Sequence, residues 1–299
     1  MRAFLSVIFL FALSLLAAAL LAYPTWLAIE TIADQPIHRV MHRVAMLCVL
    51  IGLVWLFKRW RLTDRQAYGF GLPSRELWSQ LGMGLLTGAV IILPLLVTLQ
   101  LLDVRVSDER VVLTPAFVIQ VIAKGLLTGI AVSLIEEVFF RGLLFSAVDR
   151  ESGRTAAIVW PSLLYAAVHF LGGRLRVPDE QLDWTSGFQV LERMFIAYAD
   201  PIVIADSFLA LFAVGILLAL VRVRTGAVAA CIGLHAAWVC ALYYFDVTTQ
   251  YNAQSDASWM VGTYDNVVGW ATVGWMLAMA VIYIAAARRT ASASTNSAR

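Results

Sequence analysis

Two acidic residues and one basic residue lie inside an apolar stretch of this chain. Residues 136–142 read Glu-Glu-Val-Phe-Phe-Arg-Gly, in a segment otherwise suited to lipid or to packed helices. A charged side chain near the centre of a membrane helix costs roughly 2.5–3.5 kcal/mol even on the gentler insertion scales, unless it is paired or faces a wet cavity. This segment is therefore the first candidate for chemistry.

The two glutamates have different surroundings on a helix. Glu137 and Arg141 are four residues apart with the acid first, which is the favoured order for an ion pair on one helix face. Glu136 shares its face with Phe140, which offers no countercharge. A buried carboxylate without a countercharge is suited to act as a general base on water. We therefore expect Glu137 and Arg141 to neutralise each other and Glu136 to be the reactive acid.

Two histidines in other apolar segments lie at a similar depth. Counted from the expected cytoplasmic ends of their helices, Glu136, His169 and His235 are roughly 15–21 Å into the membrane at about 1.5 Å per residue. A single buried histidine is usually a core residue with its hydrogen bonds satisfied. Three helices that bring an acid and two imidazoles to one depth instead indicate a shared cavity, and this pattern predicts a site.

The elements that position these residues are transmembrane helices. Of the 299 residues, 61% are hydrophobic and 14% are charged, a composition typical of a polytopic membrane protein. We expect an all-α transmembrane helical bundle that forms a single membrane-embedded domain over residues 1–299, with a disordered tail at 290–299. Runs of about 20 apolar residues predict eight spans, near 3–23, 40–57, 77–102, 115–147, 154–172, 201–222, 225–245 and 265–287.

Basic residues predict the orientation of these spans. The two termini and alternate connections carry thirteen Lys and Arg residues, whereas the connections on the opposite side carry seven. Short cytoplasmic connections collect such residues, so both termini are expected in the cytoplasm, and compact loops favour a bacterial inner membrane. The net charge of +2 reflects this bias, and no nucleic-acid partner is expected. The first span could instead be a cleaved signal peptide, since Arg2 precedes an apolar core followed by several alanines.

Glycine pairs predict where helices approach closely. Gly84 and Gly88, and likewise Gly125 and Gly129, occur within the sequence Gly-Leu-Leu-Thr-Gly. Small residues four apart let two helix backbones pack together in a membrane. We interpret these pairs as packing faces.

The residues considered above match the motifs of a known family. The segment 136–142 resembles the EExxFRG signature of the CPBP group, the intramembrane proteases that include the CAAX prenyl endopeptidase called the Ras-converting enzyme. Tyr165-Ala-Ala-Val-His169 is similar to the FxxxH motif of that group, with Tyr for Phe, and His235-Ala-Ala-Trp-Val239 is similar to its HxxxN motif. The resemblance covers residues from about 113 to 245, which would form the catalytic core.

This resemblance implies an intramembrane endopeptidase that hydrolyses a peptide bond near a membrane-anchored or hydrophobic terminus. By position, Glu136 would be the general base, His169 would hold and polarise the water, and His235 would stabilise the oxyanion. Glu137 and Arg141 would support them. The chain departs from the family at Val239, where Asn is usual, and losing one oxyanion donor can cost about two to three orders of magnitude in rate.

Two questions stay open at this stage. The first is the metal: we favour a mechanism without a cofactor, because adjacent glutamates point about 100° apart on a helix, but Glu136, His169 and His235 could be zinc ligands. The second is the activity, since a membrane binding or immunity protein of the same family, or a transporter, would also use buried polar residues. The expected partners are the lipid bilayer and a membrane protein or lipidated peptide, whose identity the sequence does not specify.

Overall fold

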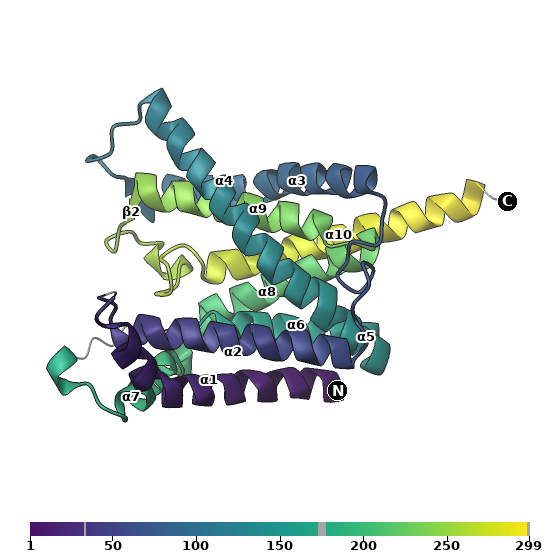
Figure 1. The fold of residues 1–299 in the computed structure, drawn as a ribbon. Helices are drawn as coiled ribbons and strands as arrows, with labels where there is room; N and C mark the ends of the chain where they lie inside the picture. The colour runs from purple at the N-terminus through teal and green to yellow at the C-terminus, as the bar shows by residue number, and fades with distance from the viewer. Residues whose placement is uncertain (33, 173–177, 298–299) are drawn as a thin grey trace.

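A bundle of long helices makes up most of the protein (Figure 1). The computed structural model describes residues 1–32, 34–172 and 178–297. Its helices are α1 (Arg2–Ile29), α2 (Ile37–Arg59), α3 (Ser74–Leu101), α4 (Pro115–Glu137), α5 (Phe145–Ser152), α6 (Arg154–Val168), α7 (Ser186–Met194), α8 (Pro201–Thr225), α9 (Ala229–Thr248) and α10 (Trp270–Ser297). A π-helix (Val138–Leu144) joins α4 to α5, and short 3₁₀ turns lie at Asp179–Gln181, Ile196–Ala199 and Ser258–Met260.

Six helices in the described part of the chain are long and apolar enough to cross a bilayer. They are α1, α2, α3, the continuous segment Pro115–Ser152, α8 and α9. The fifth expected span is shorter, because α6 has 15 residues and contains Pro161. The eighth corresponds to an apolar helix over Trp270–Ala286. The prediction of an all-α polytopic membrane bundle is confirmed.

The C-terminal part of α10 differs from the sequence-based expectation. Its backbone is helical up to Ser297, where the composition predicted a disordered tail over residues 290–299. These last turns continue directly from the apolar helix before them. The behaviour of the tail in solution stays a prediction, and residues 298–299 lie outside the described part.

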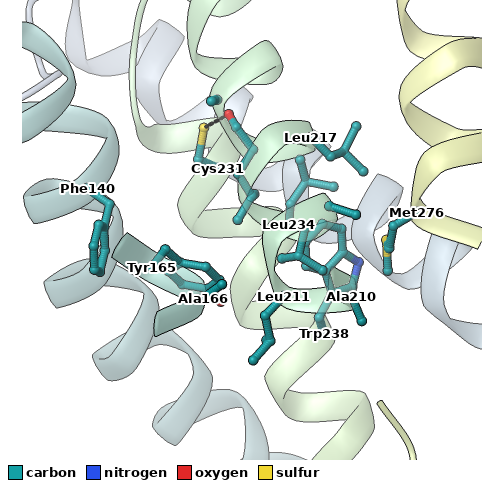
Figure 2. Packing of buried hydrophobic residues seen from close by; sticks show 14 of the residues in the cluster. Phe140, Tyr165, Ala166, Ala210, Leu211, Leu217, Cys231, Leu234, Trp238 and Met276 are labelled. Carbon is teal, nitrogen blue, oxygen red and sulfur yellow. Dashed lines mark hydrogen bonds between the residues drawn. The ribbon is translucent and has the colours of Figure 1, made fainter. Parts of the chain in front are cut away.

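Helices α8 and α9 form the centre of the bundle. In the most apolar stretch of each of these two helices, 56% of the residues are buried inside the protein. The corresponding share is 22–28% in α1 to α4, whose large apolar side chains face outwards. Figure 2 shows this core, where Leu211 of α8 and Leu234 and Trp238 of α9 pack with Met276 of α10. An apolar outer surface and a denser centre are what a helical bundle surrounded by lipid requires.

One small antiparallel ribbon lies outside the helices. Strand β1 (Arg105–Ser107) pairs with β2 (Thr249–Tyr251), with Arg105 opposite Tyr251. The buried Arg105 guanidinium donates to the side chain and carbonyl oxygens of Thr249, at 3.0 and 2.9 Å. The ribbon therefore ties the end of α3 to the end of α9.

The start of α1 and the end of α10 lie at the same end of the bundle (Figure 1). Two connections expected on the cytoplasmic side also meet, since the N–H of Val228 donates to the carbonyl of Gly69 at 3.0 Å. The Arg150 guanidinium of α5 donates to the carbonyl of Trp60, 2.8 Å away, in the connection after α2. Segments that the charge count assigned to one side of the membrane therefore lie together. Which side faces the cytoplasm stays a prediction.

The glycine pairs bring α3 and α4 onto α9. A Cβ atom on Gly84 would lie 2.3 Å from the carbonyl oxygen of Ala230, and one on Gly129 would lie 2.5 Å from that of Ala236. Both contacts are to the backbone of α9, which cannot move aside as a flexible side chain can. The predicted packing faces are therefore real close contacts, and they fix the position of the helix that carries His235.

Replacing Gly84 by Ala is expected to destabilise the fold by about 1–3 kcal/mol, because the new methyl group would overlap the α9 backbone. Gly82 provides a matched control two residues away in the same helix, since a Cβ there would have no atom within 4 Å. The free energy of unfolding of both variants in detergent micelles measures the effect. Equal stability of Gly84→Ala and Gly82→Ala would contradict the close packing of α3 on α9.

Candidate active site

A wide turn follows the two glutamates. Helix α4 ends at Glu137 and continues as the π-helix Val138–Leu144. Such segments are rare and often occur at functional sites. The sequence gives no simple signal for the π-helix, and it was not predicted. Gly142 lies in it, and a Cβ there would be 2.6 Å from the carbonyl oxygen of Tyr68, so the connection after α2 packs directly on this turn.

Glu137 is fully buried and accepts two hydrogen bonds on one oxygen. Nη1 of Arg141 lies 2.9 Å from its Oε1, which is the ion pair that the four-residue spacing predicts. Nδ1 of His235 also lies 2.9 Å from the same oxygen, a contact that the sequence analysis missed. An ionised carboxylate only accepts, so the imidazole donates through Nδ1–H. Glu137 therefore orients His235, whose other nitrogen is left for chemistry.

Arg141 is held on several sides. Its Nη2 donates to the carbonyl of Gly215 at 3.4 Å, and its guanidinium carbon lies 4.5 Å from the centroid of the Tyr165 ring. The backbone carbonyl of Arg141 accepts a 3.0 Å hydrogen bond from Nε of Arg222. These contacts satisfy the guanidinium side of the buried ion pair, whereas Oε2 of Glu137 has no hydrogen-bond partner among the described residues. Arg141 thus links the π-helix, α6 and α8.

Glu136 has the more exposed side chain, although its Oε2 atom is itself buried. Its side chain is 26% exposed, against 0% for Glu137. Its Oε2 lies 4.0 Å from Nε2 of His235 and accepts no hydrogen bond from the described residues. The expected neighbour Phe140 packs instead against Tyr165, with ring centroids 5.3 Å apart. Glu136 therefore faces an imidazole rather than an apolar wall.

His169 lies just beyond the last residue of α6. Its Nδ1 is 2.7 Å from the carbonyl oxygen of Tyr165. A carbonyl oxygen only accepts, so Nδ1 carries the proton and Nε2 of the neutral ring has a free lone pair. This hydrogen bond caps the end of the helix and sets the direction of the ring. His169 also lies within electrostatic reach of both Glu136 and His235.

A cavity of about 220 Å³ lies beside the two histidines. Its wall is formed by α3, α6, α8, α9, α10 and the segment before α10, and consists of Ile92, Leu95, Tyr165, His169, Leu211, Val214, His235, Trp238, Val239, Leu242, Tyr264, Asp265, Val267, Val268, Thr272 and Met276. The two predicted histidines therefore share one cavity. Glu136 is not part of this wall, but its Oε2 lies 4.0 Å from Nε2 of His235, which is. Glu137 and Arg141 lie behind His235.

The ring of Tyr165 lies close to both imidazoles. Its centroid is 4.5 Å from that of His169 and 6.2 Å from that of His235. In Figure 2 the side chain of Tyr165 extends from α6 on one side of the packed core, beside Phe140. Tyr165 therefore packs against both histidines.

The segment before α10 contributes residues that the sequence analysis did not identify. Tyr264 and Asp265 line the cavity, and Asp265 Oδ1 accepts hydrogen bonds from the backbone N–H groups of Val267 and Val268, at 3.0 and 2.7 Å. Burial raises the pKa of Asp265. Burial also raises the pKa of Tyr264, and the carboxylates of Asp265 and Glu136 add to this shift. A short loop with no periodic pattern carried no signal for this placement.

This segment is anchored to α8. The Ser207 hydroxyl donates to the carbonyl of Val268 at 2.8 Å. A Cβ on Gly262 would lie 2.2 Å from that hydroxyl oxygen and 2.6 Å from Oδ2 of Asp206. The absence of a side chain at Gly262 thus lets the loop reach the cavity.

The proposed zinc ligands do not fit a metal as they are placed. Among the described residues, no three His, Cys, Asp or Glu side chains are grouped as a metal ion requires. Nδ1 of His235 is bonded to Glu137, and Nε2 lies 4.0 Å from Glu136 Oε2. Ligand atoms at about 2.0–2.2 Å from a tetrahedral zinc lie roughly 3.3 Å apart. No step of the mechanism below is therefore assigned to zinc.

Comparison with known proteins shows a similarity over the segment that carries these residues. Residues 118–241 match the family model described as type II CAAX prenyl endopeptidase Rce1-like. This segment contains Glu136, Glu137, Arg141, His169 and His235, whereas Tyr264 and Asp265 follow it. No curated protein and no solved structure matches the chain.

Proposed function

We propose that this chain, whose residues 118–241 belong to the Rce1-like family of CAAX prenyl endopeptidases, is an intramembrane endopeptidase. Its substrate would be a membrane protein or a lipidated peptide, cleaved near its anchored or hydrophobic terminus. One observation carries this proposal: Oε2 of Glu136 lies 4.0 Å from Nε2 of His235, and His235 lines one cavity together with His169. A water molecule bound to Glu136 would therefore lie beside Nε2 of His235.

Two acceptors activate the water. Glu136 Oε2 accepts one of its hydrogens, and Nε2 of His169 accepts the other, because Nδ1–H of that ring is already donated to the carbonyl of Tyr165. Both hydrogens are then engaged, and an oxygen lone pair is free to attack the substrate carbonyl carbon. Glu136 takes the proton as the C–O bond forms, a general-base step typically worth about 10²- to 10⁴-fold in rate.

His235 stabilises the negative charge that results. Glu137 accepts the Nδ1–H and holds Nε2 towards the reacting group. With a proton on Nε2 as well, the imidazolium donates to the oxyanion, and the buried Glu137 carboxylate balances its charge. The C–N bond then breaks, and Glu136 returns its proton to the departing amine. The products are a new carboxyl terminus and a new amino terminus.

The proposed mechanism uses no cofactor. The proton acceptor, the water-holding group and the oxyanion donor are all side chains of this chain: Glu136, His169 and His235. The protein would lie in a bacterial inner membrane with both termini in the cytoplasm. The bias in basic residues and the common end of the cytoplasmic segments support this orientation.

Membranes that contain the wild-type protein are expected to hold protein termini that membranes containing Glu136→Ala lack. Mass spectrometry of protein termini makes this comparison across all membrane proteins at once, so no candidate substrate has to be chosen. The same termini should persist when 1,10-phenanthroline is present, whereas their loss on chelation and recovery with zinc would overturn the metal-free mechanism.

Identical sets of termini in wild-type and Glu136→Ala membranes would contradict the proposed protease activity and favour a binding or immunity protein. Val239 is the observation that supports this second function, because it lines the cavity without offering a hydrogen-bond donor.

A further inference from the structure

Val239 leaves one side of the proposed oxyanion site without a donor. It lies one helical turn after His235 on α9, and both residues line the cavity. A valine side chain has no N–H or O–H group. Within the proposed function, on which this inference rests, the negative charge would then be stabilised by His235 alone, unless another residue reaches it.

Most other donors on the cavity wall are already engaged. Nε1 of Trp238 donates to the carbonyl of Gly88 at 3.1 Å, and the Thr272 hydroxyl lies 3.4 Å from the carbonyl oxygen of Val267. Two hydroxyl groups remain, those of Tyr264 and Tyr165. Tyr264 is 44% exposed, so its hydroxyl can be satisfied by water.

Tyr165 is buried and rigidly held. It is 2% exposed, and its ring contacts those of His169, His235 and Phe140 at centroid distances of 4.5, 6.2 and 5.3 Å. In the described part of the chain, no group accepts a hydrogen bond from its hydroxyl. Because Tyr165 lines the cavity, its hydroxyl is available to donate to a group bound there.

The cation next to Tyr165 strengthens its hydroxyl as a donor. The Arg141 guanidinium lies over the ring at 4.5 Å from its centroid. A cation over an aromatic face is attracted to the ring electrons and polarises them away from the O–H bond. The same contact fixes the ring and reduces the reorganisation needed when charge develops nearby.

We propose that Tyr165 is a catalytic residue of this chain, whose hydroxyl donates a hydrogen bond to the oxyanion together with His235, in place of the donor that Val239 lacks. The hydroxyl keeps its proton throughout, so the proton balance of the mechanism is unchanged. Positions 165 and 239 are also the two at which this sequence departs from the motifs it otherwise matches. One position has gained a hydroxyl and the other has lost an amide.

Tyr165→Phe keeps the ring contacts and removes only the hydroxyl. We expect kcat to fall about 10²-fold with little change in KM, because the hydrogen bond is strongest in the transition state. Adding Val239→Asn to this variant should restore at least 10-fold of the loss, since an amide N–H then reaches the oxyanion. Tyr243→Phe, an exposed tyrosine on the same helix as Val239, is the matched control and should retain the wild-type rate.

These rates are measured on a peptide that contains the bond to be cleaved. Its sequence covers both sides of a terminus that appears in wild-type membranes and is missing from Glu136→Ala membranes. If the wild type cleaves it and Tyr165→Phe cleaves it equally fast, only the role of Tyr165 is overturned. A loss that Val239→Asn does not restore overturns it too, because such a loss reflects misfolding or altered packing. If no terminus depends on Glu136, the proposed function fails, and the role of Tyr165 fails with it.

Discussion

Glu136→Gln is expected to lower the rate of peptide cleavage by about 10²- to 10⁴-fold, the range that a general base supplies. The amide has nearly the same shape as the carboxylate but cannot take a proton from water. Because the Glu136 side chain is partly accessible and forms no hydrogen bond with the described residues, the substitution should leave the fold intact. Initial rates of the purified protein in lipid nanodiscs measure the change.

Glu76→Gln provides the control for this substitution. Glu76 lies in the first turn of α3, is exposed and is distant in sequence from the site, so the same chemical change there should leave the rate unaltered. A Glu136→Gln protein that keeps more than half of the wild-type rate would contradict the role of Glu136 as base. The neighbouring Glu137 could not replace it, since its side chain is fully buried and its Oε1 is held by Arg141 and His235.

Glu137→Leu is expected to destabilise the protein by about 3–5 kcal/mol, the cost of leaving a buried charge without its partner. The Arg141 guanidinium, 1% exposed, would lose the carboxylate 2.9 Å away. His235 would lose its acceptor at the same time. The free energy of unfolding in mixed micelles measures the loss, and cleavage should fall because His235 is no longer oriented.

The double variant Glu137→Leu/Arg141→Met separates these two effects. It removes both charges, so its loss of stability should be smaller than that of Glu137→Leu alone. Its activity should stay low, because neither leucine nor methionine can hold Nδ1 of His235. A double variant that is less stable than Glu137→Leu would show that the buried pair is not the reason for the loss.

The sequence was sufficient for the class of fold, and it singled out the polar residues that make up the candidate site. Long apolar runs require helices in a bilayer, because every backbone polar group must be satisfied within its own segment. Local spacing also predicted the Glu137–Arg141 ion pair and the close approach at Gly84 and Gly129, since both depend on helix geometry alone.

Depth along separate helices predicted that His169 and His235 meet, and the structure places both on one cavity. It did not predict how Glu136 faces them. That orientation depends on the π-helix after Glu137 and on the position of α9, which results from contacts with α3 and α4. Predicting which residues share a helix face assumes a constant number of residues per turn, and this prediction fails where an α-helix changes to a π-helix.

Only the tertiary structure decided which residues share the cavity. Tyr264 and Asp265 reach it from a loop more than twenty residues after the last motif, because Ser207 and Gly262 anchor that loop to α8. The bond between Glu137 and His235 likewise joins residues 98 positions apart. Sequence periodicity describes one helix at a time, whereas these contacts arise from the packing of several helices against one another. The sequence therefore determined the chemical groups and their depth, and the packing decided how they face each other.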